Sequence, residues 1–177
     1  MAGKFIVIEG GEGSGKDTQI ELLKKHFGEE RFVFTREPGG TRLGKEVREI
    51  LLHQKYGEVS ESAELFLFFA DRAQHVEEVI KPALAAGTTV ISNRSYISFL
   101  AYQIYGRQQL RWKGPIEQII ATLFEECPIT LAVVLDIDPA ASFERLRNMG
   151  KNLDLIERGG MELHQRTHIG PSACRRD

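Results

Sequence analysis

The feature that most constrains this chain is a glycine-rich turn between an apolar run and an amphipathic segment. The apolar run covers residues 5–8, and the turn is Gly10-Gly11-Glu12-Gly13-Ser14-Gly15-Lys16-Asp17-Thr18. Glycines let successive backbone N–H groups converge on phosphate oxygens, and the N-terminus of the following helix adds partial positive charge. A turn of this kind, closed by Gly-Lys, is the Walker A phosphate loop. We therefore expect residues 11–18 to hold nucleotide phosphates, with Lys16 reaching the outer ones.

One position of this loop departs from the common pattern. The residue after Lys16 is normally Ser or Thr, whose hydroxyl binds Mg2+, but here it is Asp17. A carboxylate is also a hard oxygen ligand for Mg2+, and Thr18 offers a hydroxyl beside it. Asp17 is equally consistent with an acidic residue in the first turn of a helix. Asp17 and Thr18 are thus the candidate metal ligands.

Short apolar stretches alternate with longer helical patterns along the rest of the chain. Strands are predicted at residues 5–8, 32–35, 88–92 and 130–135. Helices are predicted near residues 16–27, 43–53, 60–86, 96–105 and 115–126, and again after Asp138-Pro139. Apolar strands linked by helices predict an α/β fold, a parallel sheet covered on both faces. Ligands of such sheets bind beyond the carboxyl ends of the strands.

Composition narrows the class of protein further. The 177 residues suit one domain, and a hydrophobic content of 42% with 27% charged residues is ordinary. A net charge of −2 gives no basic field for nucleic acid, and no apolar stretch approaches the roughly 20 residues that span a bilayer. Met1 leads almost directly into a strand, which leaves no room for a signal peptide. Cys127 and Cys174 form no disulfide framework, so we expect a cytoplasmic protein with reduced thiols and neither nucleic acid nor membrane as partner.

Arginine side chains follow the second and the third predicted strands. Thr35-Arg36-Glu37-Pro38-Gly39-Gly40-Thr41 follows the second predicted strand, where Arg36 could clamp a phosphate or simply pair with Glu37. After the third strand, Asn93 occupies a position that commonly holds a Mg2+-binding Asp in phosphate-loop enzymes. Asn93 can accept from a metal-bound water but lacks the charge. Arg94 is placed to stabilise a transferring phosphoryl group.

Other candidates lie on the predicted helices. Arg72 falls within an apolar stripe, where it either snorkels or pairs with a core acid near Asp71, or binds a planar ligand on which Phe68 stacks. Gln103 offers an amide for a base edge. A basic run contains Arg145, Arg147 and Lys151, which is either a solvated helix end or a lid that closes over phosphates.

The motifs together resemble those of bacterial thymidylate kinases. The resemblance rests on Ile8-Glu9-Gly10-Gly11-Glu12-Gly13-Ser14-Gly15-Lys16, the Thr35–Thr41 string, Phe69-Ala70-Asp71-Arg72-Ala73-Gln74-His75 and Leu100-Ala101-Tyr102-Gln103, in order from about Phe5 to about Arg166. It implies a three-layer P-loop NTPase fold with five strands, of which four are recognisable here, and a short basic lid. It also implies transfer of the γ-phosphoryl of ATP to dTMP with Mg2+, in dTTP synthesis, by a cytoplasmic homodimer.

The resemblance also implies roles for individual residues. Residues 11–18 and Arg145 would bind ATP, and Lys16, Arg94, Arg147 and Lys151 would be the catalytic cations. The lid would supply a cation because Gly13 stands where eukaryotic-type members have a loop arginine. The dTMP site would consist of Glu12 at the sugar, Arg36 and Arg94 at the phosphate, Phe68 on the face of thymine, and Arg72, Tyr102 and Gln103 around the base.

Several positions depart from the family pattern. Asn93 replaces the Asp of an Asp-Arg motif, Ser95 shifts the aromatic to Tyr96, and Asp154-Leu155-Ile156-Glu157 lacks the arginine of a lid motif. We expect one domain over residues 1–166, with the lid at about 142–157, and an atypical tail at 167–177 that contains no fifth strand and leaves a sheet edge exposed. Two alternatives therefore stay open: a degraded nucleotide-binding relative with little turnover, or a kinase for another pyrimidine deoxynucleotide.

Overall fold

The structure of the chain, a computed structural model, describes residues 3–53 and 55–148. Its centre is a parallel sheet in the order β2-β3-β1-β4, which confirms the predicted fold class and each of the four predicted strands. The strands are β1 (Phe5–Gly10), β2 (Phe32–Arg36), β3 (Thr89–Asn93) and β4 (Leu131–Leu135). β1 and β3 occupy the middle of the sheet.

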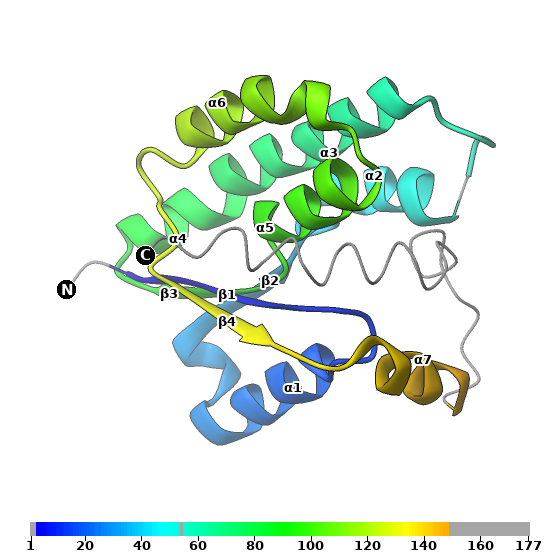
Figure 1. Ribbon diagram of the computed structural model, residues 1–177. Coiled ribbons are helices and arrows are strands. Elements are labelled where there is room, and N and C mark those ends of the chain that lie inside the picture. Colours follow the sequence, from blue (N-terminus) through cyan, green and yellow to red (C-terminus); the bar gives the residue numbers. More distant parts are fainter. Residues whose placement is uncertain (1–2, 54, 149–177) are drawn as a thin grey trace.

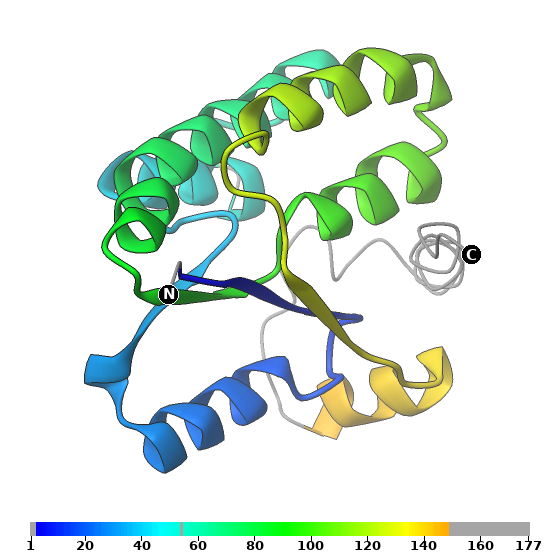
Figure 2. The same cartoon turned by 90° about the vertical axis from the view of Figure 1, so that its left-hand side faces the viewer.

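Helices cover both faces of this sheet (Figures 1 and 2), which gives the predicted three layers. One face carries α1 (Lys16–Phe27) and α7 (Pro139–Asn148). The other carries α2 (Arg42–His53), α3 (Glu61–His75), α4 (Lys81–Ala85), α5 (Tyr96–Phe99) and α6 (Lys113–Leu123). Short 3-10 turns lie at Glu29–Arg31 and Leu110–Trp112.

Side-chain caps begin four of the described helices, among them α2, where Thr41 Oγ1 accepts from the Gly44 N–H at 2.9 Å, and α5, where Ser95 Oγ accepts from the Ile97 N–H at 3.1 Å. Ser60 Oγ accepts from the backbone N–H of Ala63 at the start of α3, and Asp138 Oδ1 accepts from that of Ala140 at 2.9 Å at the start of α7. Asp138 therefore caps α7, the helix predicted after Asp138-Pro139.

Two of the predicted helices are interrupted by π-helical turns. The segment predicted as one helix at 60–86 consists of α3, a π turn at Val76–Ile80 and α4. The segment predicted at 96–105 consists of α5 and a π turn at Leu100–Gly106. Such turns insert an extra residue and are frequent at functional sites. Here the second one contains Tyr102 and Gln103.

The two sides of the sheet have cores of unequal size. The larger lies under α2–α6 and includes Phe5, Val90 and Ile104, all fully buried, whereas Ile8, Ile20 and Ile91 form a small cluster beneath α1. β4 is the exposed edge, with Leu131 51% and Val134 48% accessible within the described part of the chain. The predicted absence of a fifth strand, and the tail at 167–177, lie outside the described residues. Cys127 is a free, buried thiol, and Cys174 is likewise outside the described part.

The register of the sheet brings three loops together. Ile8 of β1 and Arg36 of β2 both pair with Asn93 of β3. The loops after these three strands therefore begin at the same end of the sheet. Backbone N–H groups of Glu37 and Arg94 donate to the carbonyls of Asn93 and Ile8, each at 3.0 Å. Among the residues described, no helix is long and apolar enough to cross a membrane.

Candidate active site

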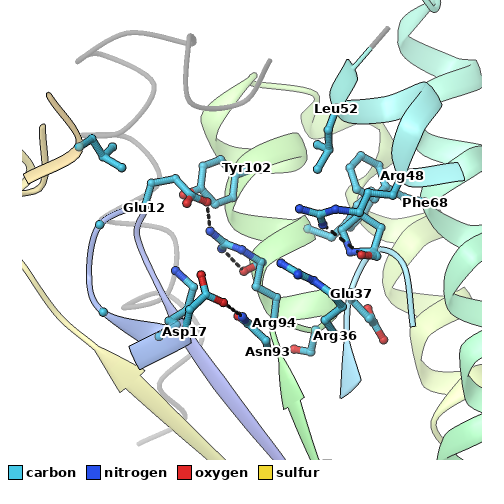
Figure 3. A pocket seen from close by; sticks show the side chains of 18 of the residues that line it. Glu12, Asp17, Arg36, Glu37, Arg48, Leu52, Phe68, Asn93, Arg94 and Tyr102 are labelled. Carbon is cyan, nitrogen blue, oxygen red and sulfur yellow. Dashed lines mark hydrogen bonds and ion pairs between the residues drawn. The ribbon is translucent and has the colours of Figure 1, made fainter. Parts of the chain in front are cut away.

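A cavity of about 700 Å³ lies at the carboxyl ends of the strands, where parallel sheets bind ligands. The predicted site residues that line it are Glu12, Gly13, Gly15, Lys16, Asp17, Thr18, Arg36, Phe68, Arg72, Arg94, Tyr102, Gln103 and Arg145. Gly11, Ser14 and Arg147 are not in this lining, and Lys151 lies outside the described residues. Figure 3 shows the side chains converging from the phosphate loop, the strand ends and the helices above them.

The phosphate loop has the conformation that its glycines predict. Gly13 and Gly15 have φ angles of 70° and 94°, which only glycine adopts readily. Lys16 is 6% exposed, and its Nζ donates to the carbonyls of Gly10 at 2.9 Å and Gly11 at 2.7 Å. Burial, with Arg94 nearby, lowers the pKa of Lys16 from 10.5 to about 8. The lysine is thus poorly solvated and gains from an anionic partner.

Asp17 and Asn93 face each other across the loop (Figure 3). Asn93 Nδ2 donates to Asp17 Oδ1 at 2.7 Å. Asp17 is exposed to solvent, whereas Asn93 is 7% exposed. Thr18 lies beside Asp17 in the cavity lining. Carboxylate, hydroxyl and amide oxygens are the ligand types that Mg2+ prefers.

Arg94 lies in the middle of the cavity wall. It has a φ of 71°, an uncommon conformation for a non-glycine residue. Its guanidinium pairs with the Glu12 carboxylate, donates to Ser98 Oγ at 2.8 Å and lies over the Tyr102 ring. A functional site is a common place for such backbone strain.

Glu9, to which the sequence motifs assigned no individual role, shares a hydrogen-bond partner, Ser98, with Arg94. It is 2% exposed, and its carboxylate accepts from the hydroxyls of Ser95 at 2.6 Å and Ser98 at 2.5 Å. Burial raises the pKa of Glu9 against the opposing effect of these hydroxyls and of Arg94. Its position directly after the predicted strand at residues 5–8 was the available signal.

Glu37 is the centre of a buried ionic network. Its carboxylate accepts from Arg72 Nε at 2.9 Å and contacts His75 Nδ1 at 3.1 Å. Burial favours the protonated acid, but Arg72 and His75 outweigh it and hold the pKa of Glu37 below its usual value. Pairing of Glu37 with Arg36 is therefore wrong as an interpretation, and Arg36 lines the cavity instead.

Arg72 is fully buried and pairs with a core acid, as one of its two interpretations predicted. The acid is Glu37 rather than a neighbour of Asp71 in the sequence. Asp71 itself accepts from the Gly39 N–H at 3.0 Å. The guanidinium lies over the rings of Phe69 and Phe99, while Phe68 packs edge-on against Phe99. Arg72 Nη1 nevertheless has no hydrogen-bond partner within the described ranges.

Gln103 has an unpaired acceptor, whereas Arg72 has an unpaired donor, within the described residues. Its Nε2 donates to Glu64 Oε1 at 3.1 Å, and its buried Oε1 has no partner among the residues the structure describes. Both Arg72 and Gln103 line the cavity. One buried donor and one buried acceptor are thus left for a ligand.

The predicted lid is described only in part. Arg145 Nη1 donates to the Gly13 carbonyl at 3.4 Å, and Ser142 Oγ donates to that of Glu12. Arg147 is exposed on α7. These contacts place α7 against the phosphate loop.

Sequence analysis missed two residues of α2 that line the cavity, Arg48 and Leu52. Arg48 Nη1 donates to the Pro38 carbonyl at 3.1 Å. Their spacing of four residues in a predicted helix, directly after the Pro-Gly-Gly turn, was the signal that could have found them.

Comparison with known proteins identifies relatives of this chain. The thymidylate kinase family model matches residues 8–170. Thymidylate kinase of Carboxydothermus hydrogenoformans is 44% identical over 100% of this chain and 86% of its own length. That of Pelotomaculum thermopropionicum is also 44% identical, over 96% of this chain and 79% of its own length. The crystal structure of thymidylate kinase from Ehrlichia chaffeensis superposes with a TM-score of 0.67 at 32% identity, over 84% of this chain and 80% of that one.

Proposed function

The chain belongs to the thymidylate kinase family, and from this premise we propose how its cavity phosphorylates dTMP. It is a kinase of the P-loop NTPase fold that acts on a small nucleotide. The finer assignments below, which concern the donor, the metal and the individual residues, are our proposal. They rest on the chemistry of the two ends of the cavity.

At the phosphate end, the loop binds the phosphates of ATP and Lys16 contacts the outer ones. Arg36 and Arg94 bind the dTMP phosphate, with Glu12 at the sugar, and Arg145 extends from α7 toward the loop. Phosphoryl transfer needs alignment and charge stabilisation more than covalent help from the protein. The poorly solvated Lys16 and the centrally placed Arg94 supply that charge, and Arg147 and Lys151 of the predicted lid would add to it.

Mg2+ fits the same end. Asp17 and Thr18 line the cavity beside the loop, and their oxygens are hard ligands of the kind the ion requires. When bound, Mg2+ neutralises charge on the transferring phosphates.

At the base end, one observation supports a pyrimidine with a keto group at C4. Arg72 Nη1 is an unused donor and Gln103 Oε1 an unused acceptor, both buried in the described part of the chain. Thymine presents the matching pair, since its O4 accepts and its N3–H donates. Cytosine presents the reverse pair, so its binding would leave buried groups unsatisfied. Phe68, which lines the cavity, supplies a face on which the base stacks.

We also propose a cytoplasmic homodimer, as the family resemblance implies.

A coupled assay of ADP release tests the function. With ATP, Mg2+ and a panel of nucleoside monophosphates, we expect turnover selective for dTMP over dCMP and the purine nucleotides. Turnover that favours dUMP would indicate a kinase for another pyrimidine. Binding of ATP without turnover of any monophosphate would contradict the proposal and indicate a degraded nucleotide-binding relative.

A further inference from the structure

Two residues of unusual identity face each other at the phosphate end. Asp17 lies in the first turn of α1 directly after Lys16, and Asn93 ends β3. They are 76 positions apart in the chain, yet Asn93 Nδ2 lies 2.7 Å from Asp17 Oδ1. The two side chains are therefore direct hydrogen-bond partners.

The contact fixes the orientation of the Asn93 amide. An ionised carboxylate only accepts hydrogen bonds, so the Asn93 amide must turn its NH2 group toward Asp17. Its oxygen then points elsewhere. That oxygen is buried and has no partner within the described ranges, in a residue that is only 7% exposed. A buried acceptor without a protein partner is available to an ion or to a water molecule bound to one.

The pair contains the same charge as the usual arrangement in phosphate-loop enzymes. There, Mg2+ is commonly held by a hydroxyl after the loop lysine and by an Asp from another part of the sheet. In this chain the carboxylate follows the lysine and the neutral side chain ends the strand. Both line the cavity, and both donate oxygen ligands of the hard type.

We propose that Asp17 and Asn93 have exchanged roles: the Asp17 carboxylate is the anionic group for Mg2+, and Asn93 positions it while its own oxygen faces the ion or its water shell. This inference rests on the proposed function for the identity of the ion. It explains why an uncharged residue at 93 is compatible with a kinase. Asp at both positions would place two carboxylates in contact, which disfavours ionisation of both.

A double-mutant cycle tests the exchange. The proteins are wild type, Asp17→Thr, Asn93→Asp and the double variant Asp17→Thr/Asn93→Asp. Calorimetry with a non-hydrolysable ATP analogue, with and without Mg2+, gives the enhancement of binding by the metal. Thermal unfolding with and without Mg2+ is the second measurement. Glu21→Gln, which removes a carboxylate one turn further along α1, is the matched control.

The exchange predicts strongly coupled effects. Asp17→Thr loses about tenfold or more of the Mg2+ enhancement, on the scale of lost metal-site residues. Asn93→Asp unfolds at a lower temperature without Mg2+ and recovers when Mg2+ is added. The double variant regains the enhancement to within about threefold of wild type, because one carboxylate and one hydroxyl are again present. Glu21→Gln behaves as wild type.

Two outcomes would overturn the assignment. One is an enhancement that Asp17→Thr leaves unchanged; the other is single-variant effects that simply add in the double variant. Failure of the proposed function is distinguishable. Wild type that phosphorylates dTMP while the variants behave additively contradicts the exchange alone. A coupled cycle in a protein that does not phosphorylate dTMP upholds the exchange and contradicts the function.

Discussion

The two ends of the cavity are built in opposite ways. At the base end, Glu37, Arg72 and His75 are each at most 3% exposed and pair with one another inside the protein. At the phosphate end, the paired side chains of Arg94 and Glu12 are 16% and 22% exposed, and Asp17 is exposed as well. The base end keeps its ionic network covered, whereas the phosphate end combines the buried side chains of Lys16 and Asn93 with partly exposed partners.

The contrast indicates that the base end is preorganised for its ligand, whereas side chains at the phosphate end can exchange protein partners for substrate. A buried network in a medium of low dielectric constant holds its members in one geometry, so Arg72 and Gln103 present fixed hydrogen-bonding groups to a base. Partly exposed pairs such as Glu12–Arg94 are weakened by water and salt more than buried pairs are. The phosphate end can therefore exchange Glu12–Arg94 and Lys16–carbonyl contacts for contacts with substrate oxygens.

The largest expected effect comes from breaking the base end. Arg72→Ala leaves the buried Glu37 carboxylate without its main cation, and we expect the free energy of unfolding to fall by about 3–5 kcal/mol. Affinity for dTMP should fall far more than affinity for ATP, because only the base loses a donor. Denaturant unfolding and separate calorimetric titrations of the two nucleotides measure both effects.

Two further variants keep this test interpretable. Arg72→Lys retains a cation for Glu37 but not the planar set of donors, so it should fold more stably than Arg72→Ala and still bind dTMP poorly. Arg36→Ala, at the phosphate end, should leave stability within about 0.5 kcal/mol of wild type. Equal weakening of dTMP and ATP by Arg72→Ala would remove Arg72 from the base site.

The phosphate end was more predictable from the sequence than the base end. The loop and α1 follow local rules of glycine conformation and helical spacing, and the predicted helix at 16–27 coincides with α1. The ionic network joins residues 35 and 38 positions apart, which local patterns do not relate. The pairing of Arg72 with Glu37 was therefore missed, although its burial was foreseen.

Helix irregularity limited the prediction in a different way. The π turn at Leu100–Gly106 determines how Tyr102 and Gln103 meet the cavity. A regular period of 3.6 residues cannot register an inserted residue. Gln103 was identified from its chemical type and motif, but its bond to Glu64 required the fold.

The two ends of the cavity should also differ in how nucleotide binding depends on pH. The pKa of Lys16 is lowered to about 8, so the free protein loses this charge as pH rises through 8. ATP binding should be insensitive to Lys16 below that value and then weaken by up to about tenfold per pH unit. Over the same window the unfolded chain binds more protons than the folded one, so this group's contribution to stability rises with pH. Calorimetric titration between pH 7 and about 9.5 measures the binding effect.

Lys16→Met isolates the lysine from other titrating groups. The variant should bind ATP weakly and lack the inflection near pH 8, while its stability is unchanged or higher because a poorly solvated cation is gone. Binding of dTMP at the preorganised end should change much less with pH. An inflection that persists in Lys16→Met would assign it to another group.

The smallest expected effect tests how firmly the base end fixes its acceptor. Glu64 accepts from Gln103 Nε2 and also pairs with Arg107; because a carboxylate cannot donate, it holds the Gln103 amide with its oxygen free. Glu64→Gln can donate as well as accept, so both orientations of Gln103 become possible. We expect the preference for dTMP over dCMP in kcat/KM to fall by about tenfold, the value of roughly one hydrogen bond.

Arg107→Met is the matched control for this change. It removes the ion pair with Glu64 but keeps the carboxylate against Gln103, so discrimination against dCMP should be retained even where stability falls. If both variants lose discrimination equally, the ion pair rather than the amide orientation controls specificity. If neither loses it, Arg72 alone suffices to select the base, and the rigidity of the base end rests on Glu37 without help from Glu64.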